Sequence, residues 1–127
     1  MPIRSVKQLV AEASAATTQI SPGDAVALVG QSGVLFVDVR EQAELDATGA
    51  IAGSVHVPRG LLEAKADPES PSHEPTLASG KRLVMYCASG ARAALAAKTL
   101  ADMGVANVSH VHGGGFNALQ AAGAATE

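Results

Sequence analysis

The single cysteine, Cys87, is the residue in this sequence most able to act as a nucleophile. It follows the apolar residues 83–86 (LVMY) and precedes residues 88–92 (ASGAR), after which a strongly helical run begins. One cysteine can form neither a disulfide within the chain nor a Cys-x-x-Cys metal or redox site. Cys87 is therefore a small buried side chain, a lone metal ligand or a reactive thiol. The residues around it must decide among these three roles.

The loop after Cys87 favours the reactive thiol. The four residues that follow are all small, namely Ala88, Ser89, Gly90 and Ala91. Because Gly90 can adopt a positive φ, successive backbone N–H groups can converge in front of the sulfur. The start of the next helix and the cation of Arg92 add positive charge beside the same atom. We expect these groups to stabilise a thiolate without a general-base histidine.

Short apolar stretches alternate with helical patterns along the chain. The expected strands lie around Ile20 and at residues 34–39, 54–57, 83–87 and 108–111. The expected helices lie at residues 5–17, from residue 21 onward, and at residues 41–48, 59–66, 91–103 and 116–122. This order predicts an α/β fold with a largely parallel sheet covered by helices on both faces. Ligands bind beyond the carboxyl ends of such strands, where Cys87 is expected.

Length and composition narrow the class of protein. A chain of 127 residues with 47% hydrophobic and 17% charged residues is typical of one globular domain, here residues 1–127, with residues 67–80 as an irregular surface excursion. The net charge of −3 and the scattered basic residues argue against nucleic acid or membrane as partners. No apolar leader precedes the first helix, so we expect a cytoplasmic protein.

Three segments resemble the rhodanese-like family. Residues 38–45 (DVREQAEL) and 49–58 (GAIAGSVHVP) are similar to an Asp-x-Arg strand end and the segment that follows it in that family. Residues 86–104 (YCASGARAALAAKTLADMG) resemble its active-site loop and helix. Residues 107–115 (NVSHVHGGG) are similar to its final strand and glycine run. Together they span about residues 36–115 in the family's order.

The resemblance implies a rhodanese-like fold, a five-stranded parallel sheet flanked by helices. It also implies a sulfurtransferase in which Cys87 takes sulfur from thiosulfate or a similar donor and passes it, as a persulfide, to cyanide or a thiol. The expected partners are these small molecules, with a sulfur-relay protein as a further candidate. No cofactor is expected. Ala88 stands where many thiosulfate enzymes of the family carry a cation.

Further residues receive roles on the same basis. The loop amides from Ala88 to Arg92 would hold the persulfide charge, and Arg92 would either bind the donor or brace the loop. Asp38 and Arg40 are expected to brace neighbouring loops near the site. Arg59 follows another strand and could face the Cys87 pocket.

The histidines His110 and His112 share one face of a predicted strand, but no third ligand stands beside them, so no metal site is expected.

Two other functions remain open. A non-enzymatic persulfide carrier or docking module would keep the fold and be loaded by a protein partner. A cysteine phosphatase or arsenate reductase also holds a thiolate in an anion-binding loop, but such phosphatases place five residues between the cysteine and the arginine. Here four residues separate Cys87 from Arg92. The smaller ring favours a persulfide sulfur over a phosphate.

Overall fold

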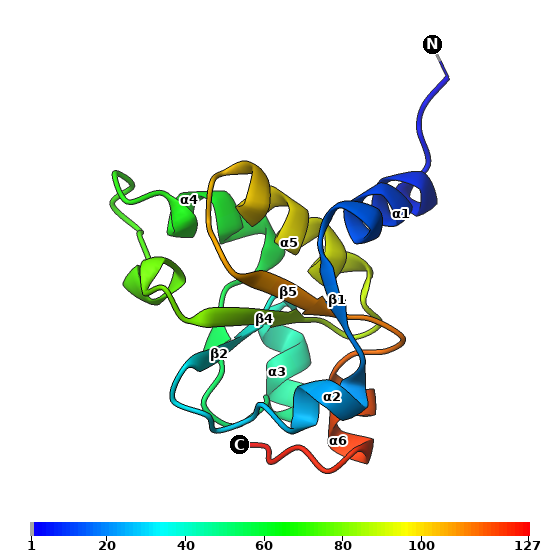
Figure 1. Ribbon diagram of the computed structural model, residues 1–127, viewed down its shortest axis with the longest axis vertical. Coiled ribbons are helices and arrows are strands. Elements are labelled where there is room, and N and C mark those ends of the chain that lie inside the picture. Colours follow the sequence, from blue (N-terminus) through cyan, green and yellow to red (C-terminus); the bar gives the residue numbers. More distant parts are fainter. Residues whose placement is uncertain (1) are drawn as a thin grey trace.

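Apolar stretches form one parallel sheet in the computed structural model, which describes residues 2–127 (Figure 1). The five strands are arranged in the order β1-β5-β4-β2-β3, and each neighbouring pair is parallel. Their bounds are β1 (Thr18–Ile20), β2 (Val34–Asp38), β3 (Val55–His56), β4 (Arg82–Tyr86) and β5 (Val108–Val111). The three inner strands are largely buried because helices cover both of their faces.

Helices pack on both sides of the sheet (Figure 1). One layer consists of α1 (Val6–Ala16), α4 (Leu62–Ala66) and α5 (Ala91–Asp102). The other layer consists of α2 (Pro22–Val26), α3 (Gln42–Thr48) and α6 (Phe116–Ala121). Each layer has its own buried cluster, centred on Met85 and Leu100 in the first and on Tyr86 and Phe116 in the second. The predicted five-stranded α/β fold is confirmed.

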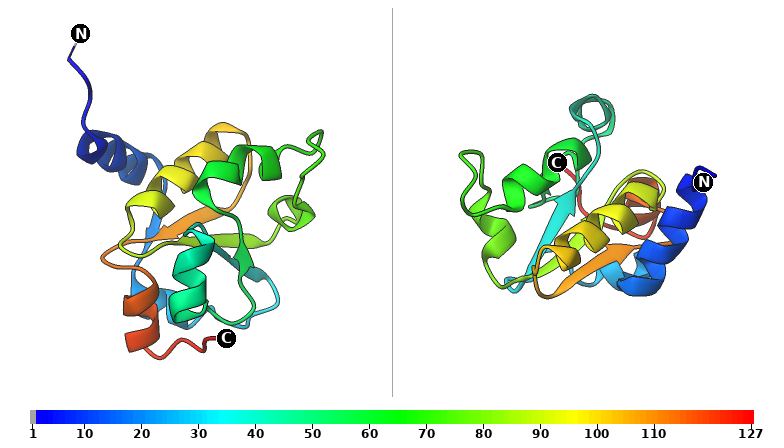
Figure 2. Two further views of the ribbon diagram at one scale, coloured as in Figure 1. Left: turned by 180° about the vertical axis from the view of Figure 1, so that it is seen from behind. Right: turned by 90° about the horizontal axis from the view of Figure 1, so that it is seen from above.

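The helix starts follow local capping signals. At α1 the hydroxyl of Ser5 accepts the N–H of Gln8, and the Gln8 side chain accepts the N–H of Ser5 in return. At α2 the hydroxyl of Ser21 accepts the N–H of Asp24. Figure 2 shows α1 lying beside α5, which it contacts.

The structure corrects two expected elements. Residues 59–66 do not form one helix, because a 3-10 turn, η1 (Arg59–Leu61), precedes α4. The segment 67–80 was predicted to be irregular, but it contains a second 3-10 helix, η2 (Pro75–Ala78), whose Leu77 is buried in the core. A proline is compatible with the first position of a helix, where its missing N–H has no partner to lose.

Within residues 2–127, the helices are all too short or too polar to cross a bilayer.

Candidate active site

Cys87 lies at the first position after β4, in the loop that leads into α5. Its side chain is fully buried, whereas Ala88 and Ser89 next to it are exposed. The backbone N–H of Gly90 donates to the Cys87 Sγ at 3.0 Å. Gly90 has a φ of 111°, a left-handed conformation that favours glycine and reverses the chain before α5 begins. The predicted turn in front of the sulfur is therefore present.

Arg92, in the first turn of α5, is turned toward α3. Its guanidinium donates to both carboxylate oxygens of Glu44, at 2.6 and 2.9 Å. Hydrogen bonding from Arg92 lowers the pKa of Glu44 to about 2, and the charge of Arg92 contributes in the same direction. In this geometry Arg92 ties the start of α5 to α3. Of the two roles expected for Arg92, bracing of the loop agrees with this contact.

Asp38 and Arg40 form a buried ion pair at the end of β2. The Arg40 guanidinium donates to both carboxylate oxygens of Asp38, to the hydroxyl of Thr48 and to the carbonyl oxygen of Gly49. Its central carbon lies 4.4 Å from the centre of the Phe116 ring. The pair therefore joins β2, the end of α3 and the start of α6.

Tyr86, the last residue of β4, is buried beneath the same region. Its hydroxyl accepts the N–H of Ile51 at 3.0 Å and donates to the hydroxyl of Ser54. Burial is the main cause that raises the pKa of Tyr86. A neutral phenol that already holds two partners is a structural group and not a source of protons.

The glycine run before α6 packs directly against the cysteine loop. The N–H of Phe116 donates to the carbonyl oxygen of Cys87 at 2.8 Å. A Cβ on Gly115 would overlap that oxygen and would lie 2.6 Å from the carbonyl oxygen of Ala88. In the sequence, this run stood out only through its similarity to the glycine run of the rhodanese-like family. The three consecutive glycines were the available signal, but the sequence could not show which backbone they touch.

Arg59 is not brought to the loop. Its guanidinium donates to the Glu63 carboxylate and to the hydroxyl of Thr99, both at 3.0 Å. Thr99 is eight residues beyond Ala91, the first residue of α5, which corresponds to about 12 Å along the helix axis. A nearer carboxylate and hydroxyl therefore take the donors of Arg59 in this geometry, and a role for Arg59 at the sulfur stays a prediction.

Two small pockets flank the cysteine loop. One, of about 200 Å³, is lined by Ala88 together with Arg40 and Phe116. The other, of about 290 Å³, is lined by Ser89 and by His110 of β5. Neither includes Cys87 among its lining residues.

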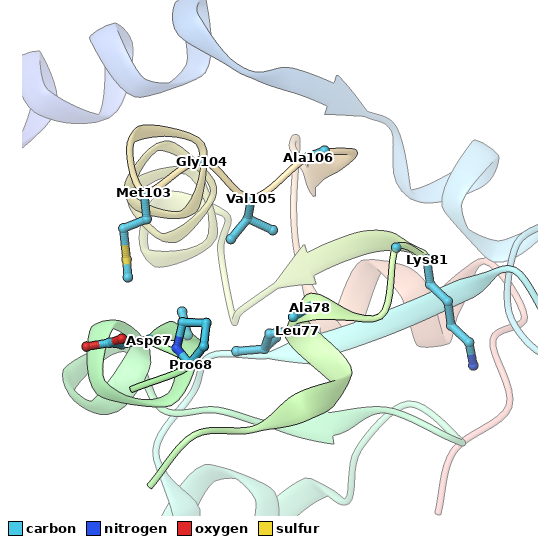
Figure 3. A pocket seen from close by; sticks show the side chains of 11 residues that line it. Asp67, Pro68, Leu77, Ala78, Lys81, Met103, Gly104, Val105 and Ala106 are labelled. Carbon is cyan, nitrogen blue, oxygen red and sulfur yellow. The ribbon is translucent and has the colours of Figure 1, made fainter. Parts of the chain in front are cut away.

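A pocket of about 460 Å³ lies at the opposite edge of the sheet, where α4 and α5 end and β4 begins. Figure 3 shows Met103 and Val105 facing Pro68 and Leu77 across this pocket. None of its lining residues belongs to the cysteine loop. Its size therefore does not make it the place where the thiol reacts.

A metal centre was not expected. Among residues 2–127, no group of three or more His, Cys, Asp or Glu side chains is placed to hold a metal ion. The groups at the loop are instead a thiol, the Gly90 N–H that donates to it and the positive end of α5, which suit a sulfur nucleophile that becomes anionic during reaction.

Comparison with known proteins gives a consistent family. The model of the rhodanese-like domain matches residues 21–122. A rhodanese-related protein from Thermoplasma volcanium has a TM-score of 0.70 at 27% identity, covering 87% of this chain and 97% of its own. The polysulfide-sulfur transferase homodimer of Wolinella succinogenes has a TM-score of 0.69 at 31% identity, covering 95% of this chain and 85% of its own.

A protein of unknown function from Rhodopseudomonas palustris, described as a possible tyrosine phosphatase, is more similar still. Its TM-score is 0.92 at 42% identity, covering 100% of this chain and 99% of its own. The comparison with curated proteins gave no match.

Proposed function

Because the chain belongs to the rhodanese-like domain family, we propose that it is a sulfurtransferase that carries sulfur as a persulfide on Cys87. The observation that carries this proposal is the contact of the Gly90 N–H with the Cys87 Sγ, at the point where β4 turns into α5. This amide, with the start of α5, would stabilise a negatively charged sulfur at that position. We expect the protein to be located in the cytoplasm. We also expect residues 1–127 to form one domain.

The reaction would proceed in two displacements at sulfur. The Cys87 thiolate attacks the outer sulfur of thiosulfate, the sulfur–sulfur bond of thiosulfate breaks, and sulfite leaves with the electron pair. The outer sulfur remains on Cys87 as an anionic persulfide. Cyanide or a thiolate then attacks that sulfur, and the persulfide bond breaks. This step regenerates the Cys87 thiolate and releases thiocyanate or a new persulfide. No cofactor takes part in these steps.

Thiosulfate is our first candidate donor and polysulfide the second. The neutral Ala88 and the engaged Arg92 leave the loop with little free cationic charge for a dianionic donor. The similarity to a polysulfide-sulfur transferase supports polysulfide as a donor. If a sulfur-relay protein loads Cys87 directly, the chain is a persulfide carrier. If Cys87 forms no persulfide at all, the chain is a docking module.

A phosphatase function is less consistent with the loop, despite the description of the R. palustris protein. Four residues separate Cys87 from Arg92, one fewer than such phosphatases use. Arg92 also gives two of its donors to Glu44, which leaves fewer for a phosphate. Failure to hydrolyse a phosphotyrosine ester under conditions that load Cys87 with sulfur would exclude this alternative.

The decisive experiment is intact-mass measurement after incubation with thiosulfate, before and after cyanide. We expect the wild-type chain to gain the mass of one sulfur atom and to lose it on addition of cyanide. Cys87→Ser, which retains a similar volume, should gain nothing. Polysulfide in place of thiosulfate tests the donor. An adduct on Cys87→Ser, or none on the wild type with either donor, would contradict the proposed enzyme, and the latter result would favour a protein-loaded carrier or docking module.

A further inference from the structure

The pocket of about 290 Å³ beside the loop contains polar groups that sulfur transfer does not use. It lies where α1, the end of β5 and the loop residues Ser89, Gly90 and Ala91 meet. Cys87 does not line it, although Gly90, whose N–H donates to the Cys87 Sγ, does. The match to the family model begins at residue 21, so α1, which forms one wall, lies outside the matched region.

His110 is the central feature of this pocket. It lies on β5 between Gln19 of β1 and Met85 of β4, and only 1% of the residue is exposed. Neither ring nitrogen has a hydrogen-bond partner among residues 2–127. A buried polar group without a partner destabilises the folded state, whereas an apolar side chain of similar size would not. The imidazole therefore has no protein partner among the described residues, and a bound ligand would supply one.

The other groups around the pocket are mainly hydrogen-bond donors. Ser14 of α1 and Ser89 of the loop contribute hydroxyls, and His112 contributes a second imidazole. Ala91 is the first residue of the twelve-residue helix α5, whose N-terminal end carries partial positive charge. None of the described residues that line the pocket is an aspartate or a glutamate. This combination suits a negatively charged ligand.

We propose that this pocket binds a small oxyanion with the chemistry of sulfite, sulfate or phosphate, and that His110 is its buried ligand. A neutral imidazole donates one N–H to such an anion, and an imidazolium donates two with a full charge. The hydroxyls of Ser14 and Ser89 supply further donors at the rim. The inference does not depend on sulfurtransferase activity, because an anion can bind whether or not Cys87 reacts.

A bound anion would change the pKa of His110. Burial, and next the neighbouring His112, lower the pKa of His110. A bound anion would oppose both effects, because its charge favours the imidazolium. Among the described lining residues only His110 and His112 titrate, since α1 contributes Val10 and Ser14 and the loop contributes no ionisable group. Anion binding should therefore tighten as the pH falls.

The test follows the histidine rings by NMR during anion titration of the Cys87→Ser chain, in which no thiol can react. Sulfite, sulfate and phosphate are compared with chloride at equal ionic strength. We expect saturable shifts at His110 and His112 with the oxyanions and not with chloride. His56, whose Nε2 bonds to the Arg40 carbonyl oxygen, and His73, whose Nδ1 bonds to that of Lys65, serve as internal references that should not move. Whichever oxyanion binds tightest identifies the source of the ligand.

Variants then assign the binding to His110. His110→Leu should stay folded and weaken binding at least about tenfold, as expected when a hydrogen bond to a charged group is lost. His73→Gln, a matched change of another imidazole, should leave binding unchanged. If His110→Leu does not fold, Ser14→Leu, which narrows the pocket from α1, serves instead. Unchanged affinity in the folded variant, or equal non-saturating shifts at all four histidines, would overturn the proposal.

Discussion

Gly115 shows how closely the last loop packs against the loop that carries the sulfur. A Cβ at this position would overlap the carbonyl oxygen of Cys87 and would lie 2.6 Å from that of Ala88. Both oxygens belong to backbone that cannot move without displacing the loop. The N–H of Phe116 holds the same oxygen. At the scale of single residues, the position of the sulfur therefore depends on a glycine more than 20 residues away in sequence.

We expect Gly115→Ala to destabilise the protein by about 2 to 3 kcal/mol and to abolish persulfide formation, because the cysteine loop must shift to admit the methyl group. Urea denaturation and the intact-mass assay measure the two effects. Gly60→Ala is the matched control, because a Cβ at Gly60 has no atom within 4 Å. A Gly115→Ala variant that loads sulfur like the wild type would show that the loop tolerates the displacement.

The ion pair between Glu44 and Arg92 gives a second prediction for single residues. If Arg92 braces the loop, Glu44→Gln should impair donor turnover nearly as much as Arg92→Gln, although Glu44 bears no charge that could attract an anion. The double variant should be little worse than either single one, with a coupling energy of about 1 kcal/mol in unfolding. If Glu44→Gln instead improved donor binding while Arg92→Gln weakened it, Arg92 would be a donor-binding residue.

At the scale of elements, α5 and α1 contribute to the site in different ways. α5 places its N-terminal end beside Cys87 and forms much of the first buried cluster through its alanines and Leu100. α1 buries only Ala13 among its residues and leaves Val6 exposed, but it closes the pocket around His110. We therefore expect α1 to open more readily than α5.

Ser5→Ala tests the local stability of α1. Loss of the hydroxyl that caps the helix should lower stability by about 1 kcal/mol. Most of this loss should fall on α1, because the reciprocal hydrogen bonds between Ser5 and Gln8 are confined to its first turn. Hydrogen exchange should become faster for amides of α1 and remain unchanged for β4 and α5. Uniformly faster exchange across the chain would show instead that α1 unfolds only together with the whole domain.

At the scale of the whole molecule, two groups predict how stability depends on pH. Burial lowers the pKa of His110 below its ordinary value of 6.5, so the unfolded chain binds a proton more readily than the folded one below that pH. Stability should therefore decrease as the pH falls below 6.5. The pKa of Glu44 is about 2 rather than 4.5, so its contribution is present above pH 4.5 and is lost between 4.5 and about 2.

Urea unfolding between pH 7.5 and pH 3 measures this dependence. His110→Leu should flatten the decrease just below pH 6.5, and Glu44→Gln should flatten the decrease below pH 4.5. Because the buried ring of His110 bonds to none of the residues 2–127, His110→Leu should also be at least as stable as the wild type at pH 5.5. An unchanged pH profile in His110→Leu would mean that another group controls stability near neutral pH.

Much of the fold could be predicted from the sequence because the signals for it are local. Alternating apolar and helical stretches predicted the parallel sheet, and the helix expected at residues 5–17 corresponds to α1. The nucleophile expected at Cys87 stays a prediction. Errors arose where a local signal was misjudged, as at η2, where Pro75 begins a helical turn instead of preventing one.

The sequence by itself determined the fold class and the small residues that follow Cys87, because these depend on residue type and on neighbours a few positions away. Only the tertiary structure decided the partners of long, flexible charged side chains. Arg59 bonds to Thr99, and Arg92 bonds to Glu44, which lies 48 positions earlier in the chain. It also decided that Gly115 touches Cys87 and that His110 is buried with no hydrogen-bond partner in the part of the chain that the structure describes. Such contacts depend on how distant elements pack. Nothing in the local sequence around an arginine or a glycine indicates which distant residue it will contact.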